Sequence, residues 1–285
     1  MKLSTTDLHL AAEAAIDLHL HTTYSDGRWT VEPLIDHLLA EQFALAAITD
    51  HDRTDTLTGI QQLALEKGLP MLVGVEMTTT WKGEMTDLLC YGFDPHHSAL
   101  NDLAQDLLRR QQENTQEVYE KLQRQGYTLP PQTLPALLAI PSAEQPHAFV
   151  ALLKEHGYGL GEPSAGRILW EAGITFATNE PAMVVEAAHR SGAVCLLAHP
   201  GHEDGFVTYD APLLDEFRRE APIDGLEVYH PLHGPAQTAM YQEYARRHHL
   251  LIGAGSDSHR PDKPPIQYQA ELCRELLERL GIQVL

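Results

Sequence analysis

Short apolar runs alternate with longer amphipathic stretches through residues 14–76 of the chain and again after residue 183. The pattern predicts strands at 14–20, 44–50, 69–76, 193–200, 223–230 and 250–259, and helices at 31–42, 56–67, 184–192 and 237–248. Short strands that are apolar on both faces and separated by helices are typical of parallel βαβ units. Both ends of the chain therefore predict an α/β fold, either a barrel or an open parallel sheet.

The middle of the chain has a different pattern. One long helix with a polar face is predicted over 100–125, and five prolines follow between residues 130 and 146. Prolines at this density disfavour regular helix and central strand, so we expect connecting or irregular structure there. We place a small, mostly helical insert at 99–178, covering the active site of a barrel formed by residues 1–98 and 179–285.

The charge balance of the 285-residue chain restricts its partners. The chain has 40 Asp and Glu against 20 Lys and Arg, which gives a formal charge of −20, and it has 17 His. Binding to duplex nucleic acid needs a surplus of cations, so stable duplex binding is not expected. Three cysteines without CxxC spacing, and the lack of a long apolar run, predict a cytoplasmic protein with no membrane span or disulfide framework.

Histidines and acidic residues recur where the predicted strands end. They are Asp17, His19, His21, Asp26, Asp50, His51, Asp52, Glu76, His199, His202, His230, His233, Asp257 and His259. The ends of several strands converge on one rim in α/β barrels. Alternate residues of a strand share a face, so His19 and His21 can bind one metal ion, with Asp17 as a supporting partner. Imidazole and carboxylate ligands without a thiolate favour an open catalytic site, for an ion such as Mn²⁺ or Fe²⁺, over a closed structural zinc.

Five segments carry most of these residues: IDLHLHTTYSDG, AITDHD, VGVE, LLAHPGH and GSDSH. In this order they resemble the successive motifs of the PHP (polymerase and histidinol phosphatase) superfamily. With the helical insert, the chain is similar to the stand-alone members that act on nucleoside 3′,5′-bisphosphates and short RNA ends. The resemblance implies a distorted (β/α)7 barrel with two or three divalent metal ions at the strand ends. We expect Mn²⁺, with Fe²⁺, Zn²⁺ and Mg²⁺ as alternatives.

The resemblance also implies the metal ligands, position by position. They are His19, His21, Asp26, His51, Glu76, His199, Asp257 and His259. One further family ligand, usually a histidine, falls on Asp87 in this chain. A carboxylate at that position adds negative charge, which would favour Mn²⁺ or Mg²⁺ or hold a third ion loosely.

The activity that the resemblance implies is hydrolysis of a phosphomonoester by a hydroxide that the metal ions activate. The expected substrate is a small phosphorylated nucleotide: the 3′-phosphate of a nucleoside 3′,5′-bisphosphate, or a short oligoribonucleotide end. His202 and His233 could donate a proton or contact phosphate, and His230 would line the site.

A second phosphate group would need its own anchor. Arg109, Arg110 and Arg167 in the insert are candidates, because guanidinium binds phosphate through two hydrogen bonds. Arg109 and Arg110 could equally cover a solvated helix face.

Three alternatives stay open on the sequence. A phosphatase that acts on histidinol phosphate would bind a phosphomonoester at the same metal ions. An amidohydrolase also begins with HxH on a barrel, but it expects a bridging lysine or an acidic substitute, and Lys82 and Lys154 fall in polar loops or helices. A non-catalytic PHP module would have lost ligands, whereas the set here is nearly complete.

Overall fold

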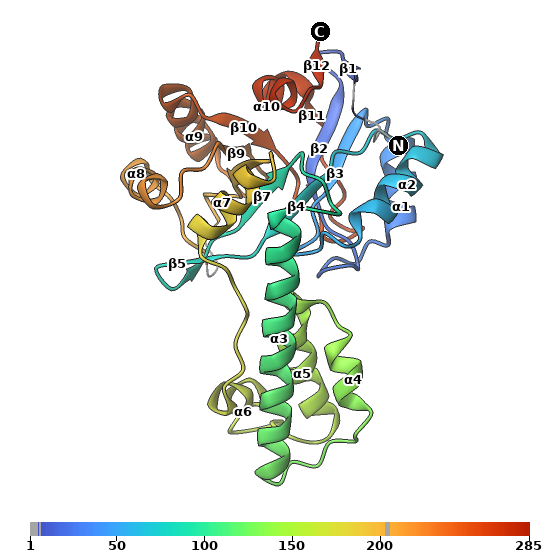
Figure 1. Ribbon diagram of the computed structural model, residues 1–285, viewed down its shortest axis with the longest axis vertical. Helices are drawn as coiled ribbons and strands as arrows, with labels where there is room; N and C mark the ends of the chain where they lie inside the picture. The colour runs from blue at the N-terminus through green and yellow to red at the C-terminus, as the bar shows by residue number, and fades with distance from the viewer. Residues whose placement is uncertain (1–4, 6, 203–205) are drawn as a thin grey trace. The chain divides into compact units, whose positions relative to one another are not determined.

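The computed structural model of the protein describes residues 5, 7–202 and 206–285 (Figure 1). These residues form two compact units, one made of residues 1–103 and 179–285 and the other of residues 104–178. No described helix is long and apolar enough to cross a membrane.

The first unit contains two main sheets. The larger has the order β10 (Leu251–Ala254), β9 (Gly225–Tyr229), β8 (Val194–Leu197), β7 (Leu88–Tyr91) and β4 (Gly74–Met77). The smaller has the order β11 (Tyr268–Gln269), β2 (Ala15–Leu20) and β3 (Leu45–Ile48). Two short pairs complete the set, β1 (His9–Leu10) with β12 (Gln283–Val284) and β5 (Thr80–Trp81) with β6 (Glu84–Met85).

The strand directions differ in part from the expected parallel arrangement. Strands β8, β9 and β10 are parallel, as are β2 and β3, whereas β7 is antiparallel to both of its neighbours. Only residues 78–87 connect β4 to β7, and a parallel crossover needs a longer connection, usually with a helix. The antiparallel β7 places the residue before it at the same sheet edge as the residues that follow β4 and β8.

Isolated bridges link the two main sheets. One joins Leu20 to Ser258, beyond the end of β10, and two others join Ala46 to Met71 and His51 to Glu76. Continuous ladders do not join the sheets, so the mixed α/β class is confirmed but a closed (β/α)7 barrel is not.

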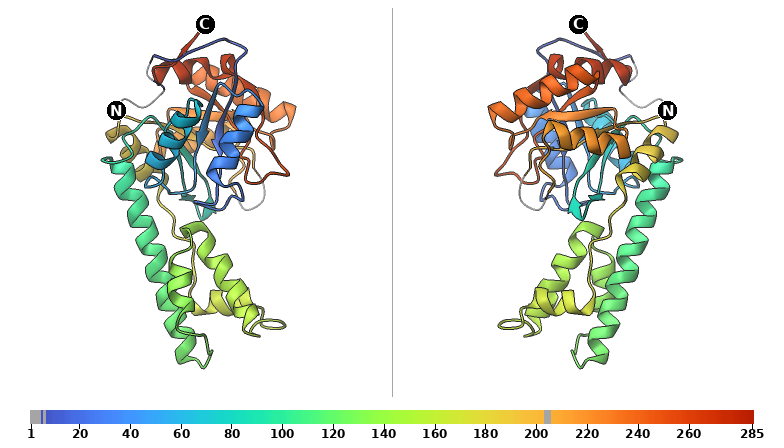
Figure 2. Two further views of the ribbon diagram at one scale, coloured as in Figure 1. Left: turned by 90° about the vertical axis from the view of Figure 1, so that its right-hand side faces the viewer. Right: turned by 90° about the vertical axis from the view of Figure 1, so that its left-hand side faces the viewer.

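Helices flank the strands of the first unit (Figures 1 and 2). They are α1 (Val31–Ala40), α2 (Leu57–Lys67), α7 (Pro181–Arg190), α8 (Ala211–Glu220), α9 (Pro235–His248) and α10 (Arg274–Arg279), with the 3₁₀ turn η2 (Ala270–Cys273). Helix α8 was not predicted from the apolar pattern, although Asp210 caps it by accepting a hydrogen bond from the Leu213 N–H. The helix expected from residue 184 begins earlier, at Pro181, because proline is well suited to the first turn of a helix.

The second unit has its own apolar core. Its elements are the long helix α3 (Ala99–Arg124), which begins in the first unit, α4 (Thr133–Leu138), η1 (Ser142–Glu144), α5 (Gln145–Glu155) and α6 (Ala165–Ala172). Phe149 and Leu153 of α5 pack with Leu122 of α3 and Leu169 of α6. That this unit covers the active site stays a prediction.

The expectation of irregular structure across the prolines is wrong at two places. Pro135 lies at the third position of α4, and Pro146 at the second position of α5. The N–H groups of the first helical turn have no partner within the helix, so a proline there removes no helical hydrogen bond.

We predict that Phe149→Ala lowers the free energy of unfolding by about 3–5 kcal/mol, because it leaves a cavity in the core of the second unit. Phe176→Ala in the same unit is the control, since its ring is 47% exposed and its loss should cost less than about 1 kcal/mol. Urea denaturation followed by circular dichroism measures both. Equal losses for the two variants would contradict the assignment of this core.

Candidate metal centre

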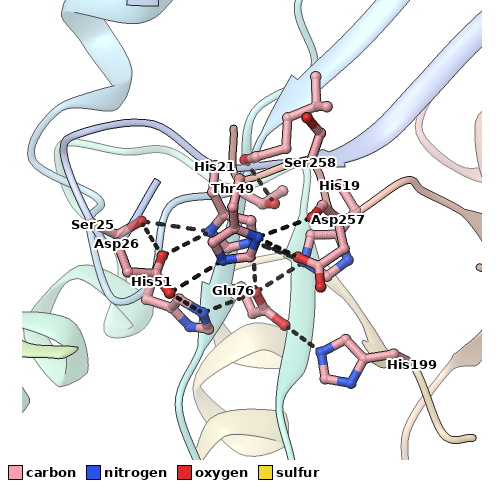
Figure 3. Close-up of polar contacts among 12 residues, drawn as sticks. His19, His21, Ser25, Asp26, Thr49, His51, Glu76, His199, Asp257 and Ser258 are labelled. Atoms are coloured by element: carbon pink, nitrogen blue, oxygen red, sulfur yellow. Dashed lines mark hydrogen bonds and ion pairs between the residues drawn. The ribbon is translucent and has the colours of Figure 1, made fainter. Parts of the chain in front are cut away.

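Histidine and carboxylate side chains from separate parts of the first unit converge at one edge of its sheets. Figure 3 labels seven of them: His19, His21, Asp26, His51, Glu76, His199 and Asp257. His19 and His21 lie on β2 and Glu76 on β4, and the others lie in the segments next to the strands. Three groups of ligand atoms have all their members within 4.8 Å of one another. They are His21, Asp26, His51 and His259; His19, His21, Glu76 and Asp257; and His51, Glu76 and Asp87.

Glu76 lies at the centre of this cluster. Its Oε2 is 2.9 Å from Nε2 of His19, 3.0 Å from Nε2 of His21 and 3.4 Å from Nε2 of His51. Its Oε1 is 3.1 Å from Nε2 of His199. The carboxylate is 1% exposed, and although burial opposes its ionisation, His19 and His51 hold the pKa of Glu76 well below its usual range.

The two histidines of β2 meet through their ring nitrogens. The Nε2 atoms of His19 and His21 lie only 3.0 Å apart, and both are also close to Oδ1 of Asp257, at 3.4 and 3.2 Å. Two imidazole lone pairs at this distance need a proton or a cation between them. Neutral imidazoles and carboxylates that converge in this way, with no thiolate, are a donor set that fits a divalent transition metal.

A more accessible group surrounds Asp26. Its Oδ2 is 3.1 Å from Nε2 of His259 and 3.8 Å from Nε2 of His51, and its Oδ1 is 3.5 Å from Nδ1 of His21. Burial opposes ionisation of this carboxyl group, yet His51 and His259 lower its pKa far below the usual value. This geometry fits a second cation position that shares His21 and His51 with the neighbouring groups.

Asp87 joins the cluster because β7 is antiparallel. It directly precedes β7, and its carbonyl oxygen accepts a hydrogen bond from the Ala198 N–H, just beyond β8. Burial, and next the negative charge of Glu76, raise the pKa of Asp87 well above its usual range. A cation near Asp87 would reverse that effect and favour the carboxylate.

Glu227, which was not predicted as a site residue, supports the cluster. Its Oε1 accepts a hydrogen bond from Nδ1 of His19 at 2.9 Å, and its Oε2 accepts one from the His199 N–H at 2.8 Å. The first bond keeps the proton of His19 on Nδ1 and leaves Nε2 free to bind a cation. The one feature of the sequence that could have indicated this role is a glutamate within the apolar run of a predicted strand.

Asp17 supports the backbone rather than an imidazole ring. Its Oδ1 accepts hydrogen bonds from the N–H groups of His19 and Ser256, and its Oδ2 accepts one from Ile266. Burial raises the pKa of Asp17 to about 7. The expected role beside the ligand rings is therefore replaced by one in which Asp17 joins β2 to the segment after β10.

Asp50 and Asp52, which follow β3, also bind neighbouring loops. Asp50 accepts hydrogen bonds from the N–H and hydroxyl of Thr22, each at 2.6 Å, and from the hydroxyl of Ser25 at 2.7 Å. Asp52 accepts one from the Thr78 N–H at 3.1 Å. These contacts hold the loops that carry Asp26 and the residues after Glu76.

The backbone at three of these positions is unusual. His199, Asp257 and Asp52 have φ angles of 24°, 53° and 54°, a region that residues other than glycine rarely occupy. Gly255 is required for close packing, because a Cβ there would lie 2.2 Å from Cβ of His19 and 2.7 Å from Oε1 of Glu227. Such strain persists only where surrounding contacts hold it, and it is frequent at functional sites.

The three expected pocket histidines have different surroundings. His230 is buried with its Nε2 3.7 Å from Oδ2 of Asp257, and the half-buried His202 packs its ring against Phe206. A cavity of about 790 Å³ is lined by both, together with Asp26, Asp257 and His259.

His233 does not fit its expected role as an acid or a phosphate contact. Its Nδ1 donates to the carbonyl oxygen of Val228 at 2.9 Å, and its Nε2 accepts from the Gly201 N–H at 3.1 Å. Both ring nitrogens are therefore engaged, and burial lowers the pKa of this imidazole, which keeps it neutral. His233 positions the loop that follows His199.

The three arginines expected to bind substrate lie in the second unit. Arg109 and Arg110 pair with Asp106 on α3, and Arg167 pairs with Glu171 on α6. Arg110 also donates to the carbonyl oxygen of Thr178 at 2.8 Å. A substrate role for these arginines stays a prediction.

Comparison with known proteins supports one family. The PHP domain model matches residues 17–279. The chain is 29% identical over 254 residues to the 5′-3′ exoribonuclease Rnm of Salmonella typhimurium, covering 86% of this chain and 85% of that protein. It is 27% identical over 287 residues to the 3′,5′-nucleoside bisphosphate phosphatase of Chromobacterium violaceum, covering 95% and 98%. A solved structure from Bifidobacterium adolescentis, described as a metal-dependent phosphoesterase, superposes with a TM-score of 0.70 at 23% identity and covers 97% of this chain and 98% of that one.

We predict that Glu227→Gln weakens Mn²⁺ binding by about 10–100-fold, because the amide removes the charge that holds the proton of His19 on Nδ1. The control is Glu275→Gln, which removes an exposed carboxylate on α10 and should leave the affinity unchanged. Isothermal titration calorimetry with Mn²⁺ measures both. Unchanged affinity in the Glu227 variant, with its fold intact, would exclude this positioning role.

Proposed function

The chain belongs to the PHP domain family, as its motifs indicate, and we propose that this metal-dependent phosphoesterase acts through the cluster around Glu76 on phosphate esters of nucleotides or short RNA ends. The observation that carries the proposal is the convergence of four histidines on one buried carboxylate. The two relatives named above act, by their names, on RNA and on nucleoside bisphosphates, so a phosphate group on a nucleotide is the chemistry that they share.

The three groups of ligand atoms would hold two or three divalent ions. His19, His21, Asp26, His51, Glu76, Asp87, His199, Asp257 and His259 are the ligands that we propose. Divalent ions bound there would act as Lewis acids and offset the negative charge of a phosphoryl group. The mixture of imidazole and carboxylate favours Mn²⁺, with Fe²⁺, Zn²⁺ and Mg²⁺ as alternatives.

The side chains around the ligands orient them and supply a proton. Glu227 keeps Nε2 of His19 directed at the cluster, and Asp17 holds the backbone of both His19 and Ser256. His202 and His230 line the cavity beside the cluster, where an imidazole can protonate a leaving oxygen. We assign that proton transfer to His202, because its side chain is less buried than that of His230, whose Nε2 lies 3.7 Å from Oδ2 of Asp257.

We also infer that the two main sheets form one distorted barrel. The bridges of Leu20 with Ser258, of Ala46 with Met71 and of His51 with Glu76 support this inference, because they lie where the sheet edges would meet. In that arrangement the order of the seven strands is β2, β3, β4, β7, β8, β9 and β10.

The amidohydrolase alternative is not favoured. Glu76, the carboxylate between the histidines, is compatible with either class, so the match to the PHP domain model and the positions of the lysines decide. Lys82 pairs with Glu216 at the surface, and Lys154 lies exposed on α5 of the second unit.

We predict that the purified protein releases phosphate from adenosine 3′,5′-bisphosphate with Mn²⁺, and that His19→Ala reduces the rate by more than about 100-fold. Even partners of metal ligands contribute about 10–100-fold, so loss of a ligand should cost more. His97→Ala is the matched control, because His97 is exposed in a loop outside the cluster. Colorimetric phosphate assays with and without a chelator measure these rates. Equal rates for His19→Ala and the native chain would refute the proposed site.

A further inference from the structure

Three cationic side chains line the cavity beside the metal cluster. They are Arg28, Arg260 and Lys263, in a chain that has twice as many acidic residues as Lys and Arg. We propose that these three cations, the basic rim, bind a second phosphate group of the substrate, an inference that rests on the proposed function. This places the second anchor in the first unit, in addition to or instead of the arginines of the insert.

The backbone holds the basic rim next to candidate metal ligands. Arg28 is two residues from Asp26, and its N–H donates to the carbonyl oxygen of His259 at 2.6 Å. Arg260 directly follows His259, and its carbonyl oxygen accepts from the Lys263 N–H at 3.0 Å. The two loops that supply the rim are therefore joined at the same place as the ligands Asp26 and His259.

A buried hydrogen-bond chain supports the turn that carries Lys263. Ser258 is buried, and its hydroxyl donates to the carbonyl oxygen of Lys263 at 2.6 Å. The indole N–H of the buried Trp29 donates to the same hydroxyl at 3.2 Å. These two hydrogen bonds fix the backbone of the turn, so that only the side chain of Lys263 is left to move.

The charges of the basic rim are less neutralised than those of several other arginines. Arg109, Arg110, Arg167 and Arg274 each form close ion pairs with carboxylates three or four residues away. Within the described part of the chain, the side chains of Arg28 and Lys263 have no ion pair, and Arg260 has only the exposed Asp262 at 3.4 Å.

The rest of the cavity suits the remainder of a nucleotide. Pro231, Leu232, Pro264, Pro265 and Ile266 form its apolar lining, and Leu232 and Ile266 are 53% and 37% exposed. An apolar wall with a few charged groups is typical of sites for small organic ligands. The cavity thus combines candidate ligands of the metal ions that would bind one phosphate, an apolar surface for a nucleoside and cations for a second phosphate.

The test compares substrates that differ in one phosphate. Native protein, Arg28→Ala, Lys263→Ala and the double variant are assayed on adenosine 3′,5′-bisphosphate and on adenosine 3′-monophosphate. The control is Arg279→Ala, which removes an exposed arginine at the end of α10. Each single variant should lower kcat/KM for the bisphosphate by about 10-fold and leave the monophosphate nearly unchanged, because a hydrogen bond to a charged group is lost. The preference for the bisphosphate should also weaken at high salt.

A third substrate, a short 5′-phosphorylated oligoribonucleotide, identifies the source of the second phosphate. If the variants lower kcat/KM only for the oligoribonucleotide, the basic rim binds a phosphate of the RNA backbone. If they lower kcat/KM for the bisphosphate, the rim binds the second phosphate of the nucleotide. Equal losses on all substrates, the monophosphate included, would overturn the proposal, as would no loss on any of them.

A binding measurement separates this inference from the proposed function. Calorimetry with adenosine 3′,5′-bisphosphate, with the monophosphate and with the oligoribonucleotide needs no turnover. If the native protein hydrolyses neither the two nucleotides nor the oligoribonucleotide, the proposed function fails. The basic rim is still supported if the double variant loses affinity for the bisphosphate or for the oligoribonucleotide and keeps its affinity for the monophosphate. Equal affinities of the native protein and the double variant for both the bisphosphate and the 5′-phosphorylated oligoribonucleotide would overturn the rim whatever the activity.

Discussion

The structure of the site depends on the ionised carboxylate of Glu76, which lies almost completely out of contact with water. A buried charge of this kind is costly unless opposite charges and hydrogen bonds compensate it. Here the compensation comes from the rings of His19, His21, His51 and His199, which reach Glu76 from three strands or the loops beside them. The same convergence leaves nitrogen atoms closer together than neutral imidazoles favour, which is the environment that a divalent cation would stabilise.

Much of the surrounding structure keeps these groups in place. Glu227 binds both His19 and the backbone of His199, and Asp17 binds the backbone of both β2 and the segment after β10. The left-handed backbone of His199 and the absence of a side chain at Gly255 allow this close approach. A chain with a formal charge of −20 could therefore still attract phosphate at this site. Bound metal ions would supply the positive charge, and many of the nearby carboxylates would face those ions or backbone N–H groups.

The candidate ligands could be predicted from the sequence because they follow a local rule, namely polar groups at the ends of apolar strands. Glu227 could not, since its contact with His19 joins residues 208 positions apart and its own strand reads as apolar core. The role of His233 depended likewise on backbone atoms of Val228 and Gly201 that only the fold brings near. The direction of β7 depends on the length of the segment that connects it to β4. Whether the insert prolines are compatible with helix depends on their position within a helical turn. An apolar pattern specifies neither.

We propose that the cluster around Glu76 is a multinuclear metal centre. Anomalous X-ray diffraction from crystals of the protein grown with Mn²⁺ would locate the bound ions. We expect at least two anomalous peaks within the three groups of candidate ligands, with Glu76 contacting more than one ion. The absence of peaks at the cluster in crystals that bind Mn²⁺ elsewhere would contradict it.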